Sequence, residues 1–184
     1  MVILYNKPYR MLSQFNANPD YPEHATLPPE LAAMQVKPVG RLDYDSEGLL
    51  LLTDDPKLEK QLLDPSNKKR KVYLAQVEGE PSQESLDLLH GGGLEIRVNK
   101  KAHTCAPVKA ELLTTAPKWL WKRTPPVDAN IETSWLQLTL TEGKNRQVRR
   151  MTAALGHATL RLIRTNIAEY ELEEVTSART PSPL

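Results

Sequence analysis

The sequence contains very little cysteine, few aromatic residues and no long hydrophobic run. Its 184 residues include one cysteine and one phenylalanine, and aromatic residues make up only 5% of the chain. Cys105 cannot form an internal disulfide, which is typical of the reducing cytoplasm. No apolar stretch approaches the roughly 20 residues of a membrane helix, and residues 1–8 lack the features of a secretory signal. These absences predict a soluble cytoplasmic protein, without a membrane partner, whose core is mainly aliphatic.

The net charge of +1 is too small to indicate a uniformly basic nucleic-acid-binding protein. The basic residues are nevertheless clustered, because residues 144–164 contain six lysines and arginines and no acid. A second basic cluster spans residues 68–71, and a third surrounds Trp119 and Trp121. One such patch is usually a solvated surface, but three in a small domain favour a polyanionic partner whose phosphates they neutralise.

The pattern of apolar residues and breakers predicts an α+β fold with a mixed, largely antiparallel central sheet flanked by helices. Strands are expected at residues 2–5, 49–52, 70–78, 94–98, 104–113, 134–141, 158–164 and 169–172. Four helices are expected, the first at residues 30–34 and the second from a cap at Asp54 or Asp55 to residue 63. The third opens at residues 81–84 and ends at the glycines 91–93, and the fourth covers residues 145–155 with Asn145 as its cap. Residues 1–184 are expected to form one catalytic domain of two packed subdomains, with an irregular excursion at 116–130 and a disordered tail at 177–184.

The stretch from Gly40 to Asp55 is the most informative part of the chain. Arg41 and the acids Asp43, Asp45 and Glu47 come immediately before four consecutive leucines, which predict a strand buried on both faces. Acids at the mouth of such a strand have a rigid support beside protein of low dielectric constant, which suits a catalytic carboxylate. The alternative is a polar loop before a core strand. A glycosidase pair is disfavoured, because residues two apart on a strand point away from each other.

A second candidate site lies in the basic segment that begins at Lys144. At helical spacing Arg146, Arg149 and Arg150 share one face, while the apolar side chains turn to the core. Cations in the first turn oppose the helix dipole, so these arginines are expected either to have another use or to be tolerated for solubility. Binding of phosphate without catalysis is the simplest alternative function for them.

Two strings carry a resemblance to a known family. G-R-L-D-Y-D-S-E-G-L-L-L-L-T and T-E-G-K-N-R-Q-V-R-R-M are similar to the two signatures of the RsuA-type pseudouridine synthases, which isomerise uridines in ribosomal RNA. The resemblance implies that Asp43 is the catalytic residue and that Arg149 pairs with its carboxylate. It also implies that Tyr73 stacks on the target base and that Leu162 packs on the other face of that base. By themselves, Tyr73 and Leu162 are ordinary strand residues.

The resemblance implies a reaction on large-subunit, 23S ribosomal RNA by a monomeric enzyme that needs no cofactor and no metal. It leaves open whether Asp43 attacks the ribose, attacks the base or acts as a base, and which uridine is modified. No S4-type RNA-binding domain is expected before the catalytic part. A non-catalytic RNA-binding module explains the basic patches equally well, but it does not explain the acid-rich motif. The residues expected to bind RNA are Arg41, Lys69, Lys71, Lys144, Arg146, Arg150 and Arg164.

Overall fold

The computed structural model describes residues 1–172, which form two compact units. Unit 1 contains Met1–Lys69 together with the chain from Ile163 onward, and unit 2 contains Arg70–Leu162. The tail predicted to be disordered from Ser177 lies outside the described residues. Among residues 1–172, no helix is long and apolar enough to cross a membrane.

Unit 1 is organised around strand β3 (Glu47–Thr53), in which all seven residues are buried. Strand β1 (Val2–Lys7) pairs with it antiparallel, and the short β2 (Lys37–Pro38) pairs with its C-terminal end. Strand β9 (Thr159–Ile167) runs parallel to the start of β3, with Gly48 opposite Arg164, and β10 (Tyr170–Glu171) folds back on β9. The leucine run is therefore a strand buried on both faces, as predicted.

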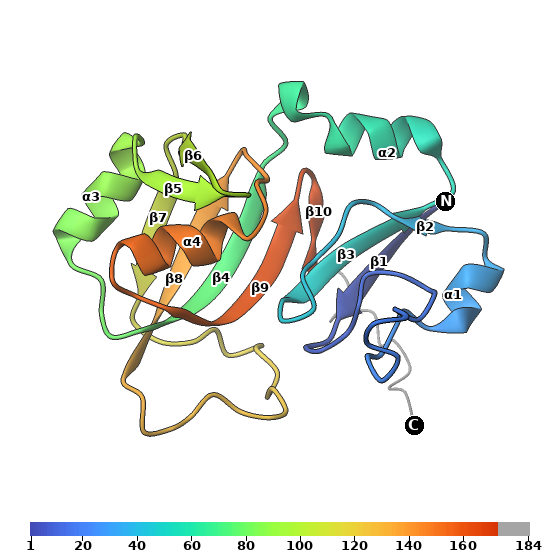
Figure 1. The fold of residues 1–184 in the computed structure, drawn as a ribbon, viewed down its shortest axis with the longest axis horizontal. Helices are drawn as coiled ribbons and strands as arrows, with labels where there is room; N and C mark the ends of the chain where they lie inside the picture. Colours follow the sequence, from blue (N-terminus) through green and yellow to red (C-terminus); the bar gives the residue numbers. More distant parts are fainter. Residues whose placement is uncertain (173–184) are drawn as a thin grey trace. The chain divides into compact units, whose positions relative to one another are not determined.

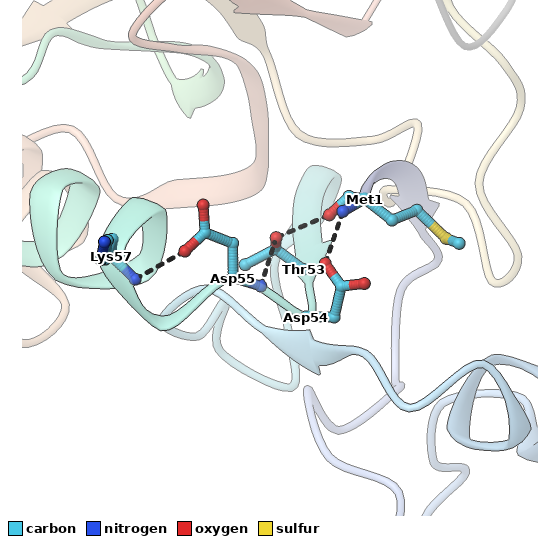
Figure 2. Close-up of polar contacts among 5 residues, drawn as sticks. All are labelled: Met1, Thr53, Asp54, Asp55 and Lys57. Carbon is cyan, nitrogen blue, oxygen red and sulfur yellow. Dashed lines mark hydrogen bonds and ion pairs between the residues drawn. The ribbon is translucent and has the colours of Figure 1, made fainter.

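Unit 1 contains two helices, of which the second is capped as the sequence indicated. Helix α1 covers Pro29–Ala33, and helix α2 covers Pro56–Leu63. A short 3₁₀ turn at Pro65–Asn67 ends this stretch. Figure 2 shows how β3 passes into α2: Thr53 accepts a hydrogen bond from the Asp55 N–H, and Asp55 caps the helix by accepting from the Lys57 N–H at 2.8 Å. The amino group of Met1 pairs with Asp54 in the same view.

Unit 2 places two helices against an antiparallel set of strands. Strand β8 (Thr133–Leu140) lies between β4 (Lys71–Glu78) and β7 (Lys109–Leu113), and β9 is the other neighbour of β4 in the sheet. Helices α3 (Gln83–Gly91) and α4 (Gln147–Ala154) contribute buried residues to one core with β4 and β8 (Figure 1). A separate hairpin pairs β5 (Glu95–Val98) with β6 (Lys101–Thr104).

The predicted fold class is confirmed, since within residues 1–172 the sheet is mixed, mostly antiparallel and accompanied by helices α1 to α4. Two local predictions were wrong. The strand expected over residues 104–113 is divided between β6 and β7, because Pro107 has no N–H for a ladder and the backbone around it bonds instead to Leu89 and Leu94. The N-cap of α4 is Arg146 in the left-handed conformation and not Asn145.

Candidate active site

The backbone on each side of Asp43 is held in unit 1. The buried hydroxyl of Ser13 accepts from the Leu42 N–H at 3.1 Å and donates to the Leu42 carbonyl at 2.9 Å. On the other side, the Arg10 N–H donates to the Tyr44 carbonyl at 2.9 Å. Leu42 itself packs into the core of this unit. The half-buried Asp43 therefore stands on a loop that is fixed at both of its neighbours, as a catalytic carboxylate requires.

A buried lysine lies close to the same acidic loop. Lys7 is completely buried at the end of β1, and its ammonium donates to the carbonyls of Pro8 at 2.9 Å and Met11 at 2.7 Å. Burial lowers the pKa of Lys7 to about 8, although the carboxylates of Glu47, Asp45 and Asp43 act in the opposite direction. A cation is thus built into the structure beside the acids. The strand predicted at residues 2–5 stopped short of Lys7, which is the last residue of β1 and the only one in it that is fully buried.

Strand β9 lies very close to β3 at Gly48. This glycine has φ +98°, and a Cβ placed on it would lie 2.4 Å from the Arg164 carbonyl oxygen. Arg164 is only 4% exposed, and its Nε donates to the Leu49 carbonyl at 2.9 Å. The structure therefore places the Arg164 side chain in the interior of unit 1, where it stabilises the start of β3. This corrects the expectation that Arg164 offers its charge to RNA phosphates at the surface.

Unit 2 contains the other three residues to which the family resemblance assigns a role. Arg149 is half-buried on α4, and its Nη1 donates to the Thr159 carbonyl at 3.0 Å, which ties the helix to the start of β9. Leu162, also on β9, is part of the core of this unit, and Tyr73 on β4 packs against that core. Tyr73 and Leu162 therefore share one apolar cluster. Asp43, in contrast, belongs to unit 1.

A hydrogen-bond network fixes the loop that leads into α4. Gln147 donates to Glu142 at 2.6 Å and accepts from the Lys144 N–H at 3.0 Å. The Ala106 N–H donates to the same Glu142 oxygen at 3.3 Å, and His103 Nε2 lies 3.3 Å from it. Burial alone raises the pKa of Glu142, but these hydrogen bonds outweigh burial and hold the pKa below its ordinary value. The network positions the first turn of α4 and hence Arg149.

The remaining basic residues differ in how far their side chains are exposed to solvent and thus to a ligand. Arg41 and Lys144 are exposed, whereas Lys69, Lys71 and Arg146 are half-buried. The Lys71 ammonium lies beside Gly143, next to Lys144, so that unit 2 gathers several cations around the entry to α4. Arg150 donates to the carbonyls of Asn145 at 3.1 Å and Arg97 at 2.6 Å, so part of its hydrogen-bonding capacity stabilises the fold.

The tryptophan-rich excursion is attached to β9 by its arginines. Arg123 donates to the Leu160 carbonyl at 2.9 Å, and Arg161 donates to the Trp121 carbonyl at 3.0 Å. The Arg161 guanidinium also lies 5.5 Å from the centre of the Trp121 ring, which allows a cation–π interaction. Residues 116–130 form an irregular segment, as predicted, and these contacts give it a defined position within unit 2.

Comparison with known proteins decides the family. The model of the RNA pseudouridylate synthase family matches residues 1–154, a range that includes Asp43, Tyr73 and Arg149. The chain belongs to this family. The pseudouridine synthase predicted from the two signatures is thereby confirmed, while Leu162 lies beyond the matched range.

Individual relatives agree with this assignment. Ribosomal large subunit pseudouridine synthase E of Xanthomonas axonopodis pv. citri is 45% identical over 179 residues, covering 94% of this chain and 88% of the relative. The protein of the same name from Vibrio parahaemolyticus is 43% identical over 176 residues, covering 95% of this chain and 70% of the relative. The crystal structure of a pseudouridylate synthase, 25% identical, superposes with a TM-score of 0.71 over 95% of this chain, which spans 65% of that solved chain.

Proposed function

We propose that this pseudouridine synthase isomerises one uridine of large-subunit ribosomal RNA to pseudouridine. Two relatives named ribosomal large subunit pseudouridine synthase E, each more than 40% identical along most of this chain, support the choice of substrate. The observation that carries the proposal is the position of Asp43, half-buried on a loop whose two neighbouring residues are both tied by hydrogen bonds. The cytoplasm, where ribosomal RNA is available, is the proposed site of action, and the enzyme acts as a monomer.

The reaction breaks the bond between uracil N1 and ribose C1′ and forms a bond between C5 and C1′. The C5 proton is released and N1 gains a proton, so the atoms balance without an added reactant. Asp43 is the group that acts at the ribose or the base while the detached uracil turns over. Because a base stacked in a duplex is out of reach of a side chain, the target nucleotide must first leave its helix.

The other selected residues receive supporting roles in the same proposal. Arg149 orients the Asp43 carboxylate through the planar, two-pronged hydrogen bonding of a guanidinium. Tyr73 stacks on the extruded uracil, and Leu162 supplies an apolar surface to its other face. The apolar cluster shared by Tyr73 and Leu162 supports this pairing of roles.

Contacts with phosphates are assigned to the basic side chains that reach the surface. The exposed Arg41 and Lys144 are the first choice, and the half-buried Lys69, Lys71 and Arg146 follow. Arg150 is retained in this group although it also bonds two backbone carbonyls. Such contacts hold the RNA in register without reading its sequence.

Release of tritium from C5-labelled uridine tests the proposal. The substrate is large-subunit ribosomal RNA from a strain that lacks the enzyme, so that the target uridine is unmodified. The expected result is stoichiometric release by the wild-type protein and none by Asp43→Asn, with RNA binding retained. If neither protein releases tritium but both bind the RNA equally, the chain is an RNA-binding module instead.

A further inference from the structure

Three aromatic rings form a column that begins at Tyr44, the residue that follows Asp43. His24 stacks on Tyr44 with ring centres 4.0 Å apart and planes 16° from parallel. It also stacks on Tyr21, with centres 5.0 Å apart and planes 6° from parallel. Tyr44 is half-buried, whereas Tyr21 is 53% exposed, so the column leads from the candidate catalytic loop out to solvent.

The loop that carries the outer two rings is anchored in unit 1. The Leu12 N–H donates to the Ala25 carbonyl at 2.8 Å, and the Leu27 N–H donates to the Gln14 carbonyl at 2.9 Å. Leu27 is fully buried in the core of this unit. Within the loop, Tyr21 and His24 are joined by a backbone hydrogen bond of 3.1 Å. The rings are thus held in a stacked arrangement before any ligand arrives, which reduces the entropy lost on binding.

The surroundings of the column carry charges of both signs, since the Glu23 carboxylate lies 3.5 Å from His24 Nε2 and the neighbouring chain supplies two arginines. Arg10 is exposed and its backbone N–H donates to the Tyr44 carbonyl, while its guanidinium lies 5.4 Å from the centre of the Tyr9 ring. Arg41 is exposed two residues before Asp43. Exposed aromatic faces beside cations are the pattern by which proteins bind single-stranded nucleic acid, since every base has a face that stacks and every nucleotide has a phosphate.

We propose that the Tyr21–His24–Tyr44 column is a stacking platform for an unpaired nucleobase that neighbours the target uridine. The base stacks on the open face of Tyr21, and Arg10 and Arg41 neutralise the adjacent phosphates. The inference rests on the proposed function, because it assigns RNA as the occupant. Its consequence is that the enzyme recognises the unpaired strand around its target, and not only the target base itself.

Steady-state and single-turnover kinetics of Tyr21 variants test the platform on unmodified large-subunit ribosomal RNA. Loss of one base–aromatic stack weakens binding by about five- to 150-fold, so Tyr21→Leu should raise KM by that factor and leave the saturated single-turnover rate unchanged. Tyr21→Phe keeps the stacking face and should restore KM to within about twofold. Leu88→Ala removes another half-exposed apolar side chain, in unit 2, and serves as the matched control.

A tyrosine that only supports the Asp43 loop gives a different result. Tyr21→Leu would then lower the saturated single-turnover rate and leave KM unchanged, and this result would overturn the proposal. A Tyr21→Leu protein in which both KM and the saturated rate are unchanged would overturn it as well. Photocrosslinking of a single-stranded RNA oligomer containing 5-bromouridine provides a second arm that needs no catalysis. A crosslink mapped to Tyr21 is expected, and its absence while other residues crosslink counts against the platform. If tritium release fails but Tyr21 still crosslinks, the failure belongs to the proposed activity and not to the stacking platform.

Discussion

Replacement of Gly48 by alanine should strongly destabilise the protein. Gly48 lies in β3, five residues after Asp43, with φ +98°. A Cβ at this position would lie 2.4 Å from the Arg164 carbonyl oxygen and 2.9 Å from both the Arg164 nitrogen and the Ile163 Cγ2. Two of these three atoms belong to the backbone of β9, so a rotamer change cannot relieve the clash.

The size of the effect follows from two contributions. A non-glycine residue in a sparsely populated backbone region costs of order 1–3 kcal/mol. Forcing an extra methyl into a packed interior costs about 1–3 kcal/mol more. Together they amount to roughly 2–6 kcal/mol, a large part of the 5–15 kcal/mol that stabilises a typical folded protein. Gly48→Ala should therefore separate β3 from β9 at this point or unfold the protein at moderate temperature.

Equilibrium urea denaturation measures the difference in the free energy of unfolding between Gly48→Ala and the wild type, with Gly91→Ala as the control. Gly91 is the last residue of α3, and a Cβ there would meet nothing within 4 Å. Alanine at this helical position should leave stability unchanged or raise it by up to about 1 kcal/mol. A Gly48→Ala protein with the same denaturation midpoint and slope as the wild type would refute the close approach of β9 to Gly48.

Three further perturbations test the parts of the site. Ser13→Ala leaves both the N–H and the carbonyl of Leu42 without their buried partner. It should therefore lower the free energy of unfolding by about 1–3 kcal/mol and reduce turnover, whereas the exposed Ser66→Ala should do neither. An active, fully stable Ser13→Ala protein would show that these two hydrogen bonds do not hold the Asp43 loop. Burial lowers the pKa of Lys7 from 10.5 to about 8, so the unfolded chain binds this proton more tightly than the folded protein does. As pH rises from 8 to 10.5, the free energy of unfolding of the wild type should therefore increase by up to roughly 3 kcal/mol relative to that of Lys7→Met. Urea titrations that show a constant difference across this pH window would argue against a buried, perturbed lysine. Arg149→Lys should lower single-turnover rates by about ten- to a thousand-fold with little change in RNA affinity, and a normal rate with weakened binding would make Arg149 a phosphate ligand instead.

The parts of the fold that depend on local chemistry could be predicted from the sequence. The leucine run predicted β3, and Asp55 and Ser82 cap α2 and α3 through their side chains as such residues do at helix starts. Asn145 has the same preference, yet it does not cap α4, because its carbonyl and side chain accept hydrogen bonds from Arg150. Gln147 closes the first turn instead.

The candidate site was only partly accessible from sequence, because several of its contacts join distant segments. The two signatures selected Asp43 and Arg149 through their spacing. Ser13 bonds Leu42 across 29 positions, and no local pattern indicates such a partner. His24 stacks on Tyr44 across 20 positions, and Tyr21 in turn stacks on His24, which no local pattern indicates. Arg164 looked like one more surface cation in a basic run, but its place in β9 turns it inward.

Single-turnover pseudouridine formation by the wild type and by Asp43→Asn is the most direct test of the central claim. The enzyme is saturating, the substrate is unmodified large-subunit ribosomal RNA, and RNA affinity and thermal unfolding are measured on the same preparations. Asp43 is half-buried on a loop whose fixed points lie in its neighbours, so the variant should fold and bind RNA like the wild type and form no pseudouridine. Product formation by Asp43→Asn at the wild-type rate would contradict the assignment of this carboxylate as the catalytic group.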